Sequence, residues 1–239
     1  MGEVKDVNDP QAGPRRGEVW CSGQVFPDGA GPADFVVVSC DEWNGRRVAT
    51  VLGVEIAEGQ SEDAGRYAPV VMVDGRPFTV YADQILPIPK DSMASTGAAL
   101  SPEVMKHIDT VLDRALTGPA TSPRDPNRPV GHPYPGQVRF ADLHIPGQTE
   151  KPVVVISSEA YGAELGYALV IVCRQTSNPG NVHDFDVALS PPHIGKVVVS
   201  SLVTIQVEDL RERSPSGSAL TPSERAQVMT AARRMLGLG

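Results

Sequence analysis

The sequence predicts a mainly β protein with a few helices, in which one β-rich unit is written twice. Two stretches, Arg16–Cys40 and Pro135–Ser158, both read as a strand, a turn-rich loop and a β-branched second strand. The two stretches align when the later one is shifted back by about 118–119 positions. Nearly the same offset recurs where each unit ends, because Leu100–Pro102 matches Leu220–Pro222. We therefore expect a tandem duplication.

The first copy predicts several strands followed by one helix. Its alternating and β-branched runs place strands at 17–22, 35–40, 47–56, 68–73 and 77–88. An Asp74-Gly75 pair between the last two indicates a hairpin turn. Ser101 can cap a helix and Pro102 suits its first position, whereas Gly118 is typical of a helix end.

The second copy repeats this order. Strands are expected at 138–143, 153–158, 168–176, 185–189 and 196–207, and Thr221 with Glu224 has the spacing of a capping box at the start of the last helix. The polar residues 1–14 read as a disordered tail, and the proline-dense residues 118–134 as a semi-rigid linker. The expected domains are therefore 15–117 and 135–239.

Composition narrows the function classes. The net charge of −8 argues mildly against a large phosphate-binding surface, although a local groove can still be basic. Three scattered cysteines fit a reducing cytoplasm, and all three are expected to be buried thiols. No apolar run approaches membrane-spanning length, and the N-terminus has no signal-peptide core. We expect a cytoplasmic protein that does not contact a membrane.

Three segments of the first copy carry a family resemblance: RRGEVW, a VVVS run followed by DEWN, and LSPEVMKHIDTVLDRAL. In this order they resemble the MazF/PemK (Kid) toxins, the endoribonucleases of type II toxin–antitoxin systems. The resemblance implies two small SH3-like β-barrels of the CcdB/MazF type, each with a C-terminal helix. Since family members act as homodimers with single-stranded RNA near the dimer interface, the chain is expected to be an intramolecular pseudo-dimer.

The resemblance also implies a metal-independent, cofactor-free reaction in which the RNA's own 2′-hydroxyl attacks the adjacent phosphate. The family uses an Arg before the Pro of strand two and a Thr at the end of strand three. The first copy has Ala33-Asp34 and Ala57-Glu58 at the matching positions, so we expect it to be inactive. The second copy keeps Pro152 and Thr176-Ser177 but has Lys151 in place of the Arg, which removes the bidentate guanidinium.

Further residues of the second copy complete the expected site. Arg174 shares a strand face with Thr176 and can replace the missing guanidinium, although it can equally be an exposed strand residue without a role. His183, in the following loop, is a candidate for proton transfer. The expected catalytic residues are Lys151, Thr176, Arg174 and His183, and the expected RNA contacts are Ser177, Lys196 and Gln175, the last of which alternates to the opposite strand face.

Other candidate groups are weaker. His183 with Asp184 and Asp186 has a loosely metal-like composition, but no other ligand completes the set, so we expect no metal and read an exposed acidic loop. Trp43 and Tyr161 can stack on bases, but their matching positions in the two copies favour a shared packing role.

Two functions remain open at this level. The first is an endoribonuclease that cleaves single-stranded RNA at one site in the second domain. The alternative is an inactive toxin fold that binds nucleic acid, or a protein such as an antitoxin or a gyrase-type target, without cleavage. A positive cleft around Lys151 and Arg174 supports RNA binding, whereas a cleft dominated by Asp34, Glu55 and Glu58 supports a protein partner.

Overall fold

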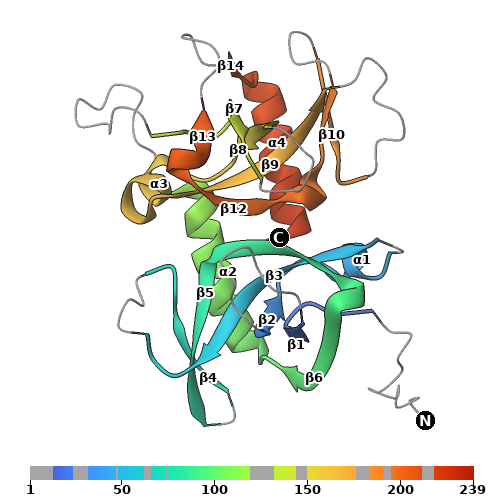
Figure 1. Ribbon diagram of the computed structural model, residues 1–239, viewed down its shortest axis with the longest axis vertical. Coiled ribbons are helices and arrows are strands. Elements are labelled where there is room, and N and C mark those ends of the chain that lie inside the picture. Colours follow the sequence, from blue (N-terminus) through green and yellow to red (C-terminus); the bar gives the residue numbers. More distant parts are fainter. Residues whose placement is uncertain are drawn as a thin grey trace.

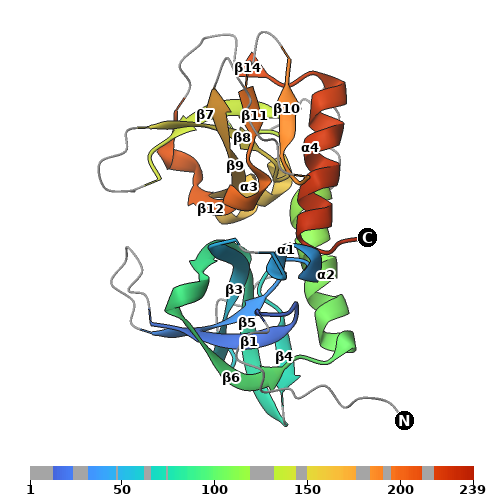
Figure 2. The same cartoon turned by 90° about the vertical axis from the view of Figure 1, so that its right-hand side faces the viewer.

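The structure is a computed structural model, and it contains two antiparallel β-sheets, one from each half of the chain (Figures 1 and 2). It describes residues 13–23, 32–46, 48–61, 66–73, 75–118, 132–143, 150–175, 184–190, 195–211 and 218–239. Figure 1 places the first half, blue to green, below the second half, yellow to red. No helix in these ranges is long and apolar enough to span a membrane.

The first half forms a sheet in the order β4-β5-β3-β2-β1-β6. A short helix lies between β2 and β3, and a long one follows β6. The elements are β1 (Glu18–Ser22), β2 (Ala33–Val37), α1 (Asp41–Asn44), β3 (Thr50–Glu58), β4 (Val70–Val73), β5 (Arg76–Pro89), η1 (Lys90–Ser92), β6 (Met93–Ala99) and α2 (Pro102–Thr117).

The second half forms a sheet in the order β10-β11-β9-β8-β7-β13, with β12 paired to β9 and β14 paired to β7. The elements are β7 (Gln137–Ala141), β8 (Lys151–Val155), α3 (Glu159–Leu165), β9 (Tyr167–Gln175), β10 (Val187–Leu189), β11 (Gly195–Val197), η2 (Val199–Ser201), β12 (Val203–Gln206), η3 (Val207–Asp209), β13 (Leu210–Arg211), β14 (Ser218–Ala219) and α4 (Pro222–Met235).

The two sheets have the same strand order, apart from breaks in the second. Strands β11 and β12 together pair with β9 as the single strand β5 pairs with β3, and β13 and β14 pair with β7 as β6 pairs with β1. Hydrogen bonds set the correspondence: Gly17 N–H donates to Val37 O and Gly136 N–H to Val155 O, both at 2.8 Å. We call residues equivalent when they hold the same place in this shared pattern.

The expected closed barrel is not seen. Among the paired strands of the described residues, the first sheet has β4 and β6 as edges and the second has β10 and β13. The short helices α1 and α3 were not expected, because four to seven residues give too little periodicity to recognise. The expected linker falls largely on 119–131, outside the described residues.

Helix α2 begins and ends where the sequence predicts, and helix α4 begins where it is expected. Ser101 Oγ accepts the Val104 N–H at the start of α2, and Gly118 follows its last residue with φ of 41°. At α4 the capping box is complete, because Thr221 accepts the Glu224 N–H while Glu224 accepts the Thr221 N–H. Figure 2 shows the two helices on the same side of the molecule.

The main hydrophobic core runs through both halves. It combines buried residues of both sheets with the inner faces of α2 and α4, including Ile108 and Leu112 of α2 and Val228 and Met235 of α4. Smaller clusters lie on the other face of each sheet, around Phe35 in the first half and around Val153, Val155 and Val170 in the second. The two halves therefore share apolar packing and are not independent bodies joined only by a linker.

Candidate functional site

Three basic residues lie side by side across neighbouring strands of the second half. Lys196 of β11 pairs directly with Arg174 of β9. Strand β8 pairs with β9 at Val153 and Val172, and continuing this antiparallel register by two residues brings Lys151 opposite Arg174. Directly opposed residues project from the same face of a sheet. Lys151, Arg174 and Lys196, here called the basic row, therefore share one face.

This face also carries the smaller apolar cluster of the second half. Side chains alternate along a strand, so every second residue lies on the same face. On β8, Val153 and Val155 share the face of Lys151 and belong to that cluster. The basic row lies where β8 begins and β9 ends. It is thus a charged margin beside a packed apolar surface.

The three residues of the basic row differ in how far their charge is available to bind an anion. Arg174 is exposed and Lys151 is half-buried, and within the described residues neither makes an ion pair. Lys196 is different, because its Nζ lies 2.9 Å from Asp186 Oδ2 and both side chains are largely buried. Asp186 neutralises Lys196, so the free positive charge of the row lies on Lys151 and Arg174.

The first half has no basic row. Ala33 is equivalent to Lys151, Ala57 to Arg174 and Thr79 to Lys196, since Asp34 pairs with Ile56, and Ala57 with Thr79, in the same pattern. Thr79 is buried and its Oγ1 donates to Gly59 O at 3.0 Å. No cation occupies any of these three positions, so only the second half offers this charge arrangement to an anion.

The register corrects two expectations about the first half. The register makes Ala57 equivalent to Arg174, whereas the sequence comparison had matched Ala57 with Thr176. Asp34 projects from the opposite face to Ala33, since successive strand residues alternate. It therefore does not lie where an anion bound at the equivalent of the basic row would sit. At these positions the first half differs from the second by its missing cations.

Several expected site residues cannot be placed. Thr176, Ser177 and His183 lie outside the described residues, as does the side chain of Gln175. The expected catalytic set is therefore described only at Lys151 and Arg174, and the expected RNA contacts only at Lys196. In the described part of the chain, no three His, Cys, Asp or Glu side chains gather as a metal site.

The aromatic candidates have packing roles. Trp43 is 6% exposed and Tyr161 is fully buried, so neither can stack on a base. Trp43 meets Phe185 edge-on, and Tyr161 meets Tyr67 in the same way. The matched positions of Trp43 and Tyr161 are visible in the sequence, but their ring partners are not, because each contact joins opposite halves of the chain.

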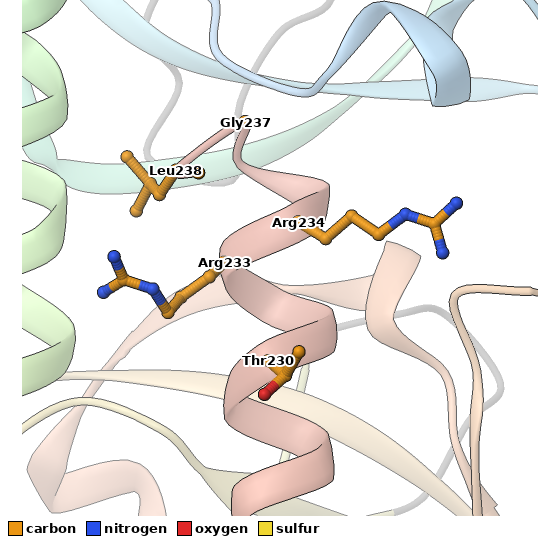
Figure 3. A pocket seen from close by; sticks show the side chains of 6 residues that line it. Thr230, Arg233, Arg234, Gly237 and Leu238 are labelled. Atoms are coloured by element: carbon orange, nitrogen blue, oxygen red, sulfur yellow. The ribbon is translucent and has the colours of Figure 1, made fainter.

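An open pocket of about 410 Å³ lies at the end of α4 (Figure 3). Figure 3 shows Arg233 and Arg234 pointing to opposite sides of this helix. Both guanidinium groups are already engaged, Arg233 with Asp113 and Arg234 with Glu42. The pocket contains no residue of the basic row and has no free charge for an anion. Its lining is Thr230, Arg233, Arg234, Gly237, Leu238 and Gly239.

Comparison with known proteins adds the following. Two solved structures of a mycobacterial endoribonuclease, one in complex with its cognate antitoxin, are 24% identical, cover 45% of this chain and 97% or 93% of their own, and have TM-scores of 0.38 and 0.37. A MazE–MazF complex from Deinococcus radiodurans is 15% identical over 45% of this chain and 97% of its own, with a TM-score of 0.36. No curated protein sequence matches. Residues 134–236, which include the whole basic row, match the family described as PemK-like, MazF-like toxins of type II toxin–antitoxin systems.

Proposed function

We propose that the chain is a toxin-type endoribonuclease that cleaves single-stranded RNA, without a metal, at one site in the second half. The observation that carries this proposal is the basic row, which is present in the half that matches the toxin family and replaced by Ala33, Ala57 and Thr79 in the other. We further propose that residues 15–117 and 135–239 are two copies of one domain and form an intramolecular pseudo-dimer. An antitoxin-like protein is the proposed regulatory partner.

The roles within the site follow from charge and position. Lys151 and Arg174, facing each other on neighbouring strands, bind the scissile phosphate and stabilise the charge that develops on it. Lys196, held by Asp186, supports the position of Arg174 from the next strand. Thr176 follows Arg174 by two residues and is proposed to contact the reacting group, with His183 as the proton-transfer candidate. This chemistry needs the 2′-hydroxyl of RNA, so DNA of the same sequence is not cleaved.

Binding without cleavage is the second candidate function. The observation that favours it is Lys151 itself, because an ammonium group offers point charge where a guanidinium grips two phosphate oxygens. In that case the second half retains affinity for RNA but does not accelerate its cleavage.

One experiment separates these functions. Purified protein is incubated with mixed-sequence single-stranded RNA in the presence of a chelator, and both cleavage and binding are measured for the wild type, K151A, R174A and K151R. Cleavage is expected in the wild type, with a loss of about 100-fold or more in K151A and R174A because each removes a charge from the transition state. K151R is expected to cleave faster than the wild type, since it restores the planar fork.

The matched control is R76A, which removes an exposed arginine from the first half, where it pairs with Glu58 at 3.4 Å. It is expected to leave cleavage unchanged. If neither the wild type nor K151R cleaves RNA, but the wild type binds RNA and K151A does not, the result supports binding without cleavage. Cleavage that survives in both K151A and R174A refutes the assignment of the site to the basic row.

A further inference from the structure

Two backbone hydrogen bonds between the halves form a matched pair. Cys40 N–H donates to Met235 O at 2.8 Å, and Ser158 N–H donates to Ala115 O at 2.9 Å. Cys40 and Ser158 are 118 residues apart, and Ala115 and Met235 are 120 apart, so exchanging the halves converts one contact into the other. This is the pattern of an isologous interface, in which residue i contacts j and the equivalents of both also meet.

The aromatic contacts follow the same rule. The ring centroids of Trp43 and Phe185 lie 5.6 Å apart, and those of Tyr67 and Tyr161 lie 5.1 Å apart, both with interplanar angles of 82°. Trp43 and Tyr161 are 118 residues apart, as are Tyr67 and Phe185. Both pairs are edge-to-face arrangements, which aromatic rings prefer over a face-to-face sandwich.

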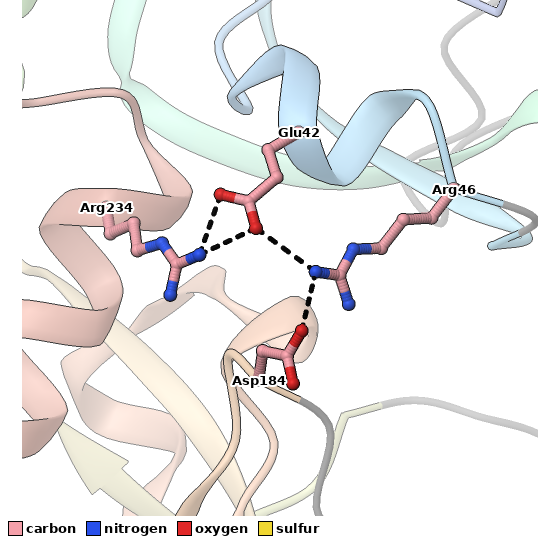
Figure 4. A network of polar contacts seen from close by, with 4 residues as sticks. All are labelled: Glu42, Arg46, Asp184 and Arg234. Carbon is pink, nitrogen blue, oxygen red and sulfur yellow. Dashed lines mark hydrogen bonds and ion pairs between the residues drawn. The ribbon is translucent and has the colours of Figure 1, made fainter.

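Two charged contacts are related by the same exchange of halves, but here the equivalent residues carry opposite charges. Arg46 pairs with Asp184 at 2.9 Å (Figure 4). The exchanged contact joins Glu164, equivalent to Arg46, with Arg66, equivalent to Asp184. The first half thus contributes an arginine to both contacts and the second half a carboxylate to both. A pair of identical first halves would set Arg46 against Arg66, and a pair of identical second halves would set Glu164 against Asp184.

A third contact joins equivalent positions directly. Asp113 of α2 and Arg233 of α4, which are 120 residues apart, form an ion pair. In a symmetric pair of like halves this position would meet itself. Two first halves would then bring Asp113 against its own copy, and two second halves would do the same with Arg233.

We propose that these three charge pairs are a pairing code, by which each half of the chain accepts the other half and rejects a second copy of itself. The inference rests on the proposed pseudo-dimer but not on the proposed cleavage activity. Like charges set opposite each other oppose a wrong pairing, and such repulsion is how related interfaces reach specificity. The code gives the first half a role without a basic row: it is the required partner of the second half.

Not every charged contact between the halves belongs to the code. Arg234 also pairs with Glu42, with N–O distances of 2.6 and 2.7 Å (Figure 4). The hydrogen bond from Arg234 lowers the pKa of Glu42, so this contact is charge-assisted. However, Arg114 is equivalent to Arg234. Two first halves would therefore keep an Arg–Glu contact here, whereas two second halves would set Arg234 against Ala160, so this pair does not oppose a pairing of first halves.

The test exchanges two charges in the full chain. R66D/D184R keeps composition and net charge but reverses the preferences: Arg46 then faces the arginine introduced at position 184, and Glu164 faces the aspartate introduced at position 66. Contacts between two first halves, or between two second halves, become attractive at the same positions. The matched control R46E/R66D/E164R/D184R reverses all four signs and restores attraction within the chain.

Two properties are measured over a range of protein concentrations: the molecular mass, by light scattering, and the unfolding temperature. The wild type is expected to run as a monomer of 25.4 kDa. Compared with the wild type, R66D/D184R is expected to dimerise at least about tenfold more strongly, or to remain a monomer that unfolds at a lower temperature. The four side chains are 31% to 69% exposed, so each ion pair contributes a modest energy, and the two contributions add up. The fourfold variant is expected to restore both properties, and 1 M salt to shrink the difference by screening.

A R66D/D184R chain with wild-type mass and unfolding temperature overturns the proposal, as does a fourfold variant no better than the double variant. Neither readout uses RNA. A chain that passes this test but never cleaves RNA therefore refutes only the proposed function, whereas one that cleaves RNA but fails here refutes only the code.

Discussion

The contact between Phe185 and the first half gives the sharpest test of the shared core. Phe185 precedes β10 in the second half and is 1% exposed. Its ring meets Trp43 edge-on, and the guanidinium groups of Arg46 and Arg234 lie over it with Cζ at 5.2 and 4.5 Å from its centroid. F185A removes the ring from a site in which neighbours from both halves surround it.

The expected loss of unfolding free energy is about 3–5 kcal/mol, the range for truncating a buried Phe. About 0.5–1.5 kcal/mol is the typical worth of an edge-to-face aromatic contact such as that with Trp43. In a chain of this size each kcal/mol lowers the unfolding temperature by about 2–4 °C. F185A should therefore unfold roughly 6–20 °C below the wild type.

The assay is thermal and urea unfolding followed by circular dichroism and by tryptophan fluorescence. Both tryptophans, Trp20 and Trp43, lie in the first half, whereas the substitution is in the second. A fluorescence transition that shifts together with the dichroism transition shows that the damage crosses between the halves. The control M72A changes a residue that is 59% exposed and should stay within about 0.5 kcal/mol of the wild type. A loss below about 1 kcal/mol, or an unshifted fluorescence transition, would refute the reasoning.

Three further outcomes are expected. G118A should lower the unfolding free energy by at least about 1 kcal/mol in urea titrations, because Gly118 has a positive φ and an added Cβ would collide with Ser158; a neutral result would contradict the close approach. T221A should cost about 1 kcal/mol by the same measurement because it removes the cap of α4, and T221S should keep most of it. Burial raises the pKa of Cys173 from 9.0 to about 11, so the folded state holds this proton more tightly than the unfolded state. Stability should then be unaffected below pH 9 and fall as pH rises from 9 to 11; in C173A the fall should be smaller, and an equal fall would contradict the assignment.

The sequence allowed the elements to be predicted where the signal is local. Ser101 and Thr221 mark helix starts by their side-chain chemistry, and Gly118 marks a helix end by its backbone freedom. Alternation and β-branching gave most strands within a few residues but missed β6, β13 and β14, which have no β-branched run. The repeated pattern suggested that both halves share one strand order. The split of one long strand into β11 and β12 was not foreseen, because it depends on η2 between them.

The site was also predicted only where the signal is local. Arg174 was recognised as a candidate from strand alternation alone, and its neighbour Lys151 from the resemblance. That Lys196 lies beside Arg174 and is neutralised by Asp186 required the register of β9, β10 and β11. The sequence comparison misplaced Ala57 by two residues, because the register makes it the equivalent of Arg174 and sequence similarity in a β-branched run does not define hydrogen-bond register.

Features that depend on neighbouring residues, namely the helix caps and the strand alternation, could thus be read from the sequence, and the constant offset favoured two copies of one unit. Which charges meet follows only from the folded chain, as for Arg46 and Asp184 at 138 residues of separation. The physical reason is range. A cap or an alternating strand is stabilised by its own neighbours, whereas an ion pair between the halves exists only once two folded surfaces have docked in one orientation.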